Sequence, residues 1–242
     1  MKIIDAFWEK RNLGVSCTEI MIEKDDHVSC VDKISSTLEA SDYLVVKVPI
    51  GRFDINESLT QNGFVFVEGS INFHLNVKDA ILSPLQQRLN NVVTYSEMTE
   101  SDLIQLFNEI EAGMFKTDRI LLDSCFTEKQ AATRYVNWIK DEIGKAAQVY
   151  KIVYKEDSIG FFAFKKVGDD VYYPFLAGLY EKFANSGLGF ATLRKPIEES
   201  IKRGGRMIST YVSTNNHPVL RAHTQQGFSI NELQYVFVKH TK

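Results

Sequence analysis

The chain has 242 residues, of which 44% are hydrophobic and 24% charged, and its formal net charge is -3. This composition is typical of a globular protein with a sizeable core, and the charge excludes a general basic field for nucleic acid. The three cysteines, Cys17, Cys30 and Cys125, are far apart in the sequence. We therefore expect reduced thiols in a cytoplasmic protein, with no metal. No apolar run reaches the roughly 18 residues of a membrane span, so no membrane partner is expected.

In chain order, the first part of the sequence alternates short strand patterns with short helical ones. Strands are predicted at residues 18–23, 43–48, 63–67 and 70–77, and helices at residues 31–40 and 56–62. The polar segment 83–91 is rich in Gln and Asn, and we interpret it as a junction or a surface loop. The sequence therefore predicts an N-terminal α/β portion, residues 1–92, and a second domain, residues 93–242.

The second part has clearer boundaries. One helix is predicted after Thr99 and Ser101 and is closed by Gly113. Another is predicted over residues 127–146, where Thr127 and Gln130 have the spacing of a capping box. Strands follow at residues 149–154, 159–165 and 171–180, then a glycine loop and a helix that ends near Arg203. Further strands are predicted at residues 207–212 and 235–238.

The loop between the third of these strands and the next helix contains Gly187 and Gly189. Free backbone N–H groups at the start of a helix form an anion site, and glycine lets a phosphate approach the backbone. The groups that this loop offers are those of Ser186, Gly187, Leu188, Gly189, Phe190 and Ala191. The segment lacks the third glycine of a dinucleotide fingerprint and the Gly-Lys-Ser/Thr of a Walker loop.

A second segment, residues 209–228, contains Asn216 after a predicted strand and Gly227-Phe228 after a short helix. Together the two segments resemble the paired signatures of the GNAT superfamily of N-acetyltransferases. The likeness is close over the last 65 residues or so, and the element order extends it to about Val93. Three positions depart from the family pattern: Ala184 at its Gln/Arg, Val219 at its Ala and His223 at its Tyr.

The resemblance implies an α/β (α+β) fold in which a mixed, mostly antiparallel sheet splays between the fourth and fifth strands of the domain. It implies acetyl-CoA as the co-substrate, bound by the loop and by Asn216, and direct attack of an amine on the thioester. A backbone N–H of Leu179 or Tyr180 is then expected to face the oxyanion. His223 is the predicted proton donor to the thiolate if it is charged at that step, with Tyr211 and Tyr235 as alternatives.

The start of the chain, with Trp8 and Gly14, resembles that of TDP-fucosamine acetyltransferases, which are built from an N-terminal α/β portion and a GNAT domain. Residues 118–126, followed by Tyr135 and Trp138, resemble a second stretch of that group. This likeness implies a nucleotide-linked amino sugar of polysaccharide biosynthesis as the acceptor. Arg119 is the predicted partner of a substrate phosphate, with a surface or structural ion pair to Asp118 or Asp123 as its alternative. Asp123 is predicted to orient the sugar or the amine.

Two other functions remain open from the sequence. One is a GNAT enzyme that acts on a different small amine or on a peptide. The other is a non-catalytic module that senses acyl-CoA or a nucleotide sugar, which the replacements at Ala184 and His223 allow. The sequence also leaves a homodimer open.

Overall fold

The protein is described from a computed structural model, which covers residues 1–37 and 41–241. Its described strands form a ten-stranded mixed sheet in the order β1-β2-β3-β10-β4-β9-β8-β7-β6-β5. The strands are β1 (Lys2–Asp5), β2 (Cys17–Met21), β3 (Tyr43–Pro49), β4 (Val65–Asn76), β5 (Val93–Glu97), β6 (Gln148–Tyr154), β7 (Asp157–Lys166), β8 (Val171–Leu179), β9 (Met207–Ser213) and β10 (Ser229–His240). The expected α/β fold with a mostly antiparallel sheet is confirmed.

The helices agree with the sequence patterns at most places. They are α1 (Trp8–Leu13), α2 (Cys30–Thr37), α3 (Phe53–Gln61), α4 (Pro84–Asn90), α5 (Glu100–Glu111), α6 (Arg119–Leu122), α7 (Glu128–Ile143), α8 (Ala191–Lys202) and α9 (His217–Gln225). Residues 38–40 of the first predicted helix lie outside the described residues. The interpretation of residues 83–91 as a loop was wrong: Ser83 and Gln86 form a capping box, and Pro84 begins helix α4.

The order of elements along the chain repeats. The series β1, β2, α2, β3, α3, β4 is followed later by β7, β8, α8, β9, α9, β10. In each series the second and third strands are parallel neighbours, β2 with β3 and β8 with β9. The last strands of the two series, β4 and β10, pair with each other at the centre of the sheet. The sheet is therefore arranged about an approximate two-fold axis between β4 and β10, a repeat that the sequence did not reveal.

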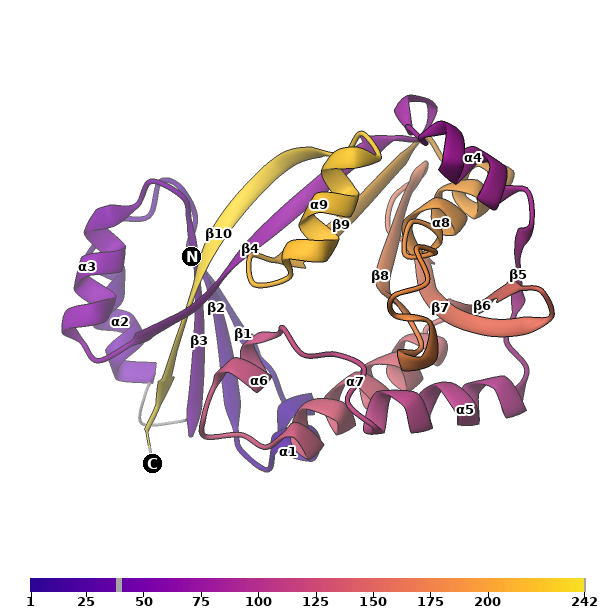
Figure 1. The fold of residues 1–242 in the computed structure, drawn as a ribbon. Coiled ribbons are helices and arrows are strands. Elements are labelled where there is room, and N and C mark those ends of the chain that lie inside the picture. Colours follow the sequence, from indigo (N-terminus) through magenta and orange to yellow (C-terminus); the bar gives the residue numbers. More distant parts are fainter. Residues whose placement is uncertain (38–40, 242) are drawn as a thin grey trace.

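The two series also exchange their last strands. Strand β10 pairs with β3 of the first series, and β4 pairs with β9 of the second series. Figure 1 shows both long strands crossing the middle of the molecule between its two ends. The predicted boundary between residues 92 and 93 stays a prediction, but strands from both portions are interleaved in one sheet.

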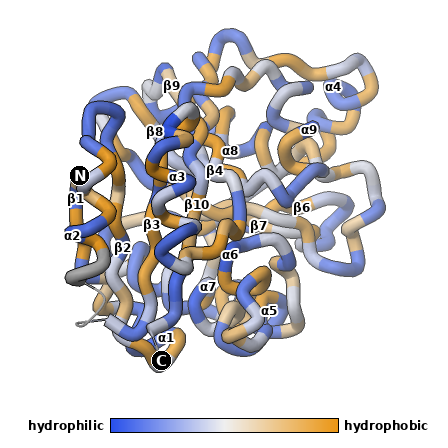
Figure 2. The backbone as a smooth tube through the Cα atoms, turned by 90° about the vertical axis from the view of Figure 1, so that its left-hand side faces the viewer, coloured by the Kyte–Doolittle hydropathy of each residue, from blue (hydrophilic) through white to orange (hydrophobic). Residues whose placement is uncertain are grey.

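Apolar side chains are buried on both faces of this sheet. Helices α2 and α3 pack on one face of β2 and β3, while α1, α6 and the start of α7 contribute to a cluster on the other. Strand β3 is coloured hydrophobic over most of its length (Figure 2), as expected for a strand that is covered on both sides. In the second series, α8 and α9 pack on one face, and α5 and α7 on the other.

The two parallel strand pairs differ in a way that matters for binding. Strands β2 and β3 pair from Cys17–Tyr43 to Met21–Lys47, along the whole of β2. Strands β8 and β9 pair only at Val171–Met207 and Tyr172–Ile208 and then diverge. An irregularity in the pairing of β8 with β7 leaves Phe175 between Pro174 and Leu176 as the extra residue of a β-bulge, which bends the strand. The expected splay is therefore present in the second series. Among the described helices, none is both long and apolar enough to cross a bilayer.

Candidate active site

A cavity of about 1140 Å³ lies where β8 and β9 diverge. Its lining comes from both series: Tyr173, Phe175 and Ala177 of β8 on one side, and Glu19, Lys47 and Glu68 of the N-terminal strands on the other. Helices α1, α6 and α7 and the starts of α8 and α9 complete the wall. A volume of this size holds a ligand of several hundred daltons. The residues around it fall into a backbone part, near α8 and β8, and a charged part, near α1 and α7.

The backbone part begins with the glycine loop before α8. This loop directly precedes the cavity residues Thr192 and Leu193 but is not itself part of the lining. Helix α8 has 12 residues, and the N–H groups of Gly187, Gly189 and Phe190 have no acceptor in the part of the chain that the structure describes. The N–H of Leu188 donates to Ser186 Oγ at 3.3 Å, while those of Ser186 and Ala191 donate to backbone carbonyls. Half of the six predicted donors are thus free, and they lie at the positive end of the helix dipole.

The two glycines of this loop differ in backbone conformation and in the space around them. Gly187 has a φ of +78°, a left-handed conformation that other residues adopt only with strain. Gly189 has no such φ, and a Cβ built on it meets no atom within 4 Å. The fold itself therefore leaves the space above Gly189 open. The free N–H groups and this open space fit the pyrophosphate of coenzyme A.

Backbone donors also face the gap between β8 and β9. The N–H of Tyr180 donates to the carbonyl of Ile159 on β7 at 2.9 Å, so this predicted oxyanion donor is occupied. Because successive N–H groups of a strand point to opposite edges, those of Leu179 and Ala177 point toward the diverging β9. Ala177 also lines the cavity, and the sequence had not singled it out. Leu179 therefore stays a predicted oxyanion donor, and the N–H of Ala177 has the same orientation.

Helix α9 brings Asn216 and His223 to the same cavity. Asn216 is the N-cap, and its Oδ1 accepts from the N–H of Val219 at 3.3 Å. The imidazole of His223 is 2% exposed and packs between the rings of Phe73 and Phe228. Its Nδ1 lies 2.8 Å from the carbonyl of Val219, so Nδ1 carries the proton and Nε2 is left as a buried acceptor without a partner among the described residues.

This environment opposes the predicted role of His223 as a proton donor. Burial lowers the pKa of His223 to about 4, and the hydrogen bond to Val219 offsets it only in part. A neutral imidazole with Nδ1–H directed at a carbonyl has no second proton to give. Tyr211 of β9 is about half exposed and lines the cavity, and burial raises the pKa of its hydroxyl, which therefore keeps its proton at neutral pH. Tyr211 is thus better placed as the donor, whereas Tyr235 is not among the cavity residues.

The depressed pKa of His223 predicts a pH dependence of stability. In the unfolded state His223 binds a proton below about pH 6.5, whereas in the folded state it does so only near pH 4. The contribution of the neutral imidazole to the unfolding free energy is therefore fully present above pH 6.5 and is lost as the pH falls toward 4. Between pH 7.5 and 5, the wild type should lose roughly 2 kcal/mol more unfolding free energy than His223→Asn. Urea unfolding at both pH values measures this difference. Equal losses in the two proteins would contradict a buried neutral imidazole.

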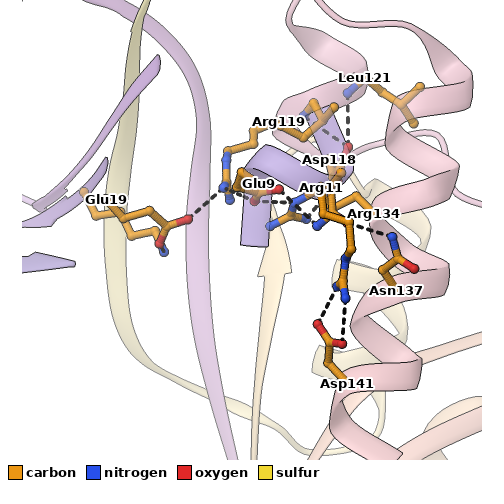
Figure 3. A network of polar contacts seen from close by, with 12 residues as sticks. Glu9, Arg11, Glu19, Asp118, Arg119, Leu121, Arg134, Asn137 and Asp141 are labelled. Atoms are coloured by element: carbon orange, nitrogen blue, oxygen red, sulfur yellow. Dashed lines mark hydrogen bonds and ion pairs between the residues drawn. The ribbon is translucent and has the colours of Figure 1, made fainter. Parts of the chain in front are cut away.

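The charged part of the cavity is a continuous network (Figure 3). Arg119, 8% exposed, donates to Glu19 at 2.7 Å and lies 3.4 Å from Glu9, which is fully buried. Arg134 Nε donates to the same Glu9 oxygen at 2.7 Å and approaches Asp118 at 3.7 Å, and Lys47 pairs with Glu19 at 3.1 Å. Arg119 therefore has the structural ion pairs that the sequence left as its alternative role, with partners other than those expected. Its contact with a substrate phosphate stays a prediction that these pairs do not favour.

Asp123 lies outside the cavity lining. Its Oδ2 is 2.7 Å from His240 Nε2, and its Oδ1 accepts from the N–H of Cys125. A direct contact with a ligand in the cavity is not supported by this placement. Ligand atoms of Asp123, Cys125 and His240 lie within 4.8 Å of one another, a grouping of metal-ligand types that the sequence did not predict. The hydrogen bond between Asp123 and His240 accounts for their proximity.

Comparisons with known proteins agree with this geometry. No family model matches the chain. Mycothiol acetyltransferase from Corynebacterium efficiens is 27% identical over 84 residues, which are 35% of this chain and 28% of that protein. The match thus spans less than a third of the length of that relative.

Solved structures resemble the fold over nearly the whole chain. A GCN5-related N-acetyltransferase from Sphaerobacter thermophilus aligns with a TM-score of 0.66 and 9% identity, covering 100% of this chain and 76% of that one. A GCN5-related glucosamine N-acetyltransferase region of a fungal β-N-acetylglucosaminidase aligns with a TM-score of 0.66 and 10% identity. This alignment covers 93% of this chain and 30% of that one. A tandem GNAT protein of clavulanic acid biosynthesis aligns with a TM-score of 0.60 and 9% identity, covering 93% of this chain and 75% of that one. The chain has the fold of the GCN5-related N-acetyltransferases.

Proposed function

We propose that this protein is an N-acetyltransferase that transfers the acetyl group of acetyl-CoA to the amine of an amino sugar. The observation that carries the proposal is the free anion site before α8, which opens beside a gap between two parallel strands. A pyrophosphate at the N–H groups of Gly187, Gly189 and Phe190 lets the pantetheine arm enter that gap. The edges of β8 and β9 offer backbone groups to this arm along the gap.

The residues of the gap supply what acyl transfer requires. The N–H of Leu179 or Ala177 stabilises the oxyanion that forms when an amine attacks the thioester. The hydroxyl of Tyr211 gives a proton to the departing sulfur. His223 Nε2, as an acceptor inside the cavity, holds a donor group of the bound molecules in place. No covalent intermediate on the enzyme is needed.

The acceptor is proposed from the charged part of the cavity and from the comparisons. One structural neighbour is described as a glucosamine N-acetyltransferase region, and an amino sugar is the acceptor that the sequence resemblance implies. Arg119 is already paired with two carboxylates. The phosphates of a nucleotide-linked sugar therefore face Lys140 and Lys145, exposed cations that also line the cavity.

A thiol-release assay tests the proposed function. The protein is mixed with acetyl-CoA and with glucosamine, a nucleotide-linked amino sugar, spermidine or a lysine peptide, and free CoA thiol is followed. Release with a sugar amine supports the proposal, and release only with spermidine or the peptide changes the acceptor class. Tight acetyl-CoA binding without release for any amine favours a sensor. In the same assay, His223→Asn with unchanged turnover and CoA affinity would remove a catalytic role of His223.

The repeated architecture leads to a prediction about stoichiometry. The segment of the first series that corresponds to the glycine loop contains Glu23, Asp25 and Asp26 and no glycine. The strands on either side of it, β2 and β3, are paired along all of β2, so no gap is open for a pantetheine arm. Titration calorimetry with CoA should give one site per chain. Two sites of similar affinity would contradict this difference between the series.

A further inference from the structure

Glu68 of β4 lines the cavity without a charged partner. Ser70, two residues later, lines it as well, so both side chains project from the same face of the strand. Glu68 Oε2 is buried and has no hydrogen-bond partner among the described residues. No ion pair in the described parts of the chain includes Glu68. This carboxyl group therefore faces the cavity, and no cation of the described residues pairs with it.

The charges around Glu68 are balanced without it. The network contains three cations, Lys47, Arg119 and Arg134, and its three carboxylates are Glu9, Glu19 and Asp118. These six groups alternate in sign and pair with one another, so their formal charges cancel. An ionised Glu68 therefore adds one uncompensated negative charge to this part of the cavity. An ionised carboxylate that is buried without a counterion is costly, unless it binds a proton or a cationic ligand.

The titration of Glu68 agrees with such a role. Burial raises the pKa of Glu68 above its ordinary value, and nearby Asp118 adds to this. A hydrogen bond with Ser213 and the charges of Arg119 and Lys47 lower the pKa only in part. A carboxyl group with a raised pKa is a stronger base once ionised, which suits the removal of a proton from an ammonium group.

We propose that Glu68 binds the ammonium group of the acceptor and removes its proton, a catalytic role that rests on the proposed acetyltransferase function. An N–H bond of the ammonium breaks, the proton passes to Glu68 Oε2, and the nitrogen keeps the electron pair. This pair forms the C–N bond at the acetyl carbonyl carbon. The C–S bond breaks with its electrons on sulfur, which takes the proton of the Tyr211 hydroxyl, and the second proton of the nitrogen restores that hydroxyl. Glu68 then releases its proton to solvent.

The proposal also defines the chemistry of the acceptor. The group that enters this part of the cavity carries one positive charge and is a primary amine with at least two N–H donors. A neutral amide or hydroxyl at this place leaves the Glu68 charge uncompensated. The site should therefore distinguish glucosamine from glucose, which differ at a single substituent.

The test uses the full chain with Glu68→Gln, which keeps the size of the side chain and removes its charge. Glu57→Gln is the matched control, because Glu57 lies on α3 outside the cavity lining and accepts an exposed hydrogen bond from Gln61. Glucosamine and glucose binding is measured by calorimetry in the presence of CoA. The wild type and the control should bind glucosamine about tenfold more tightly than glucose, and Glu68→Gln should lose this preference.

Turnover gives the second readout. For the amine that the thiol assay identifies, Glu68→Gln should lower kcat about 100-fold or more. Its rate should rise steadily with pH as free amine accumulates, whereas the wild-type rate levels off once Glu68 is ionised. Glu68→Asp should recover part of the loss. A wild type that turns over no amine and binds no CoA overturns the proposed function. An active wild type with an equally active Glu68→Gln, or a glucosamine preference that survives in Glu68→Gln, overturns the role of Glu68 alone.

Discussion

Gly189→Asp is expected to raise the Kd for CoA about 100-fold, equivalent to about 2.8 kcal/mol of binding free energy. The new carboxylate occupies the space beside the free N–H groups of the loop and repels a pyrophosphate. The fold itself should tolerate the change, because a Cβ at Gly189 meets no atom within 4 Å. A negative charge at the N-terminus of α8 also suits the helix dipole. Calorimetry for CoA and a thermal melt separate the two effects.

Asn185→Asp is the control for charge, since Asn185 is an exposed residue of the same loop. It adds the same charge without filling the space at Gly189, and we expect its effect on CoA affinity to be less than about tenfold. Equal Kd values for Gly189→Asp and the wild type would show that CoA does not bind at this helix. A melting temperature well below that of the wild type would instead show that the loop has a structural role.

Arg119→Met is expected to lower the unfolding free energy by about 3–5 kcal/mol, because it leaves two buried carboxylates short of a partner. Glu9 then keeps only Arg134 as a cationic partner, and Glu19 keeps only Lys47. For a chain of this size, the melting temperature should fall on the order of 10 °C. Urea unfolding and a thermal melt measure both quantities.

Arg11→Met is the matched control for this variant. Arg11 forms a bidentate pair with Asp141 at the surface, and the two side chains are 51% and 38% exposed. Exposed pairs contribute about 1 kcal/mol or less, so this variant should remain close to the wild type. Wild-type stability together with lost binding of a nucleotide sugar in Arg119→Met would show that Arg119 is a ligand for substrate phosphate.

Local patterns were sufficient to predict the elements around the proposed cofactor site. The strand β8, the glycine loop and α8 follow one another within about 30 residues, and each has its own local signal: alternation, glycine and an apolar face. The splay of β8 from β9 was implied by the family resemblance, and the structure confirms it. The orphan Nε2 of His223 was not foreseen, because it depends on the tautomer that Val219 selects.

Contacts between distant residues explain what the sequence did not reveal. Arg119 meets Glu9 and Glu19, which are 110 and 100 positions away, and no spacing rule relates them. Glu68 falls between the strands predicted at residues 63–67 and 70–77, whereas the structure has a single strand β4 there. Only the pairing of β4 with β9 and β10 turns the face that carries Glu68 toward the cavity. Glu68 is identified by a buried carboxylate oxygen without a hydrogen-bond partner and by the lack of an ion pair among the described residues, and a sequence does not show this.

The exchange of β4 and β10 has a consequence for how the protein is made. Strands β3 and β4 leave the ribosome early, yet the strand that lies between them is residues 229–240. Until that strand is synthesised, β3 and β4 each keep an edge of unpaired N–H and C=O groups, and such edges pair readily with other chains. Pairings this far apart in sequence also form slowly. The nascent chain therefore depends on protection from aggregation until its synthesis reaches β10.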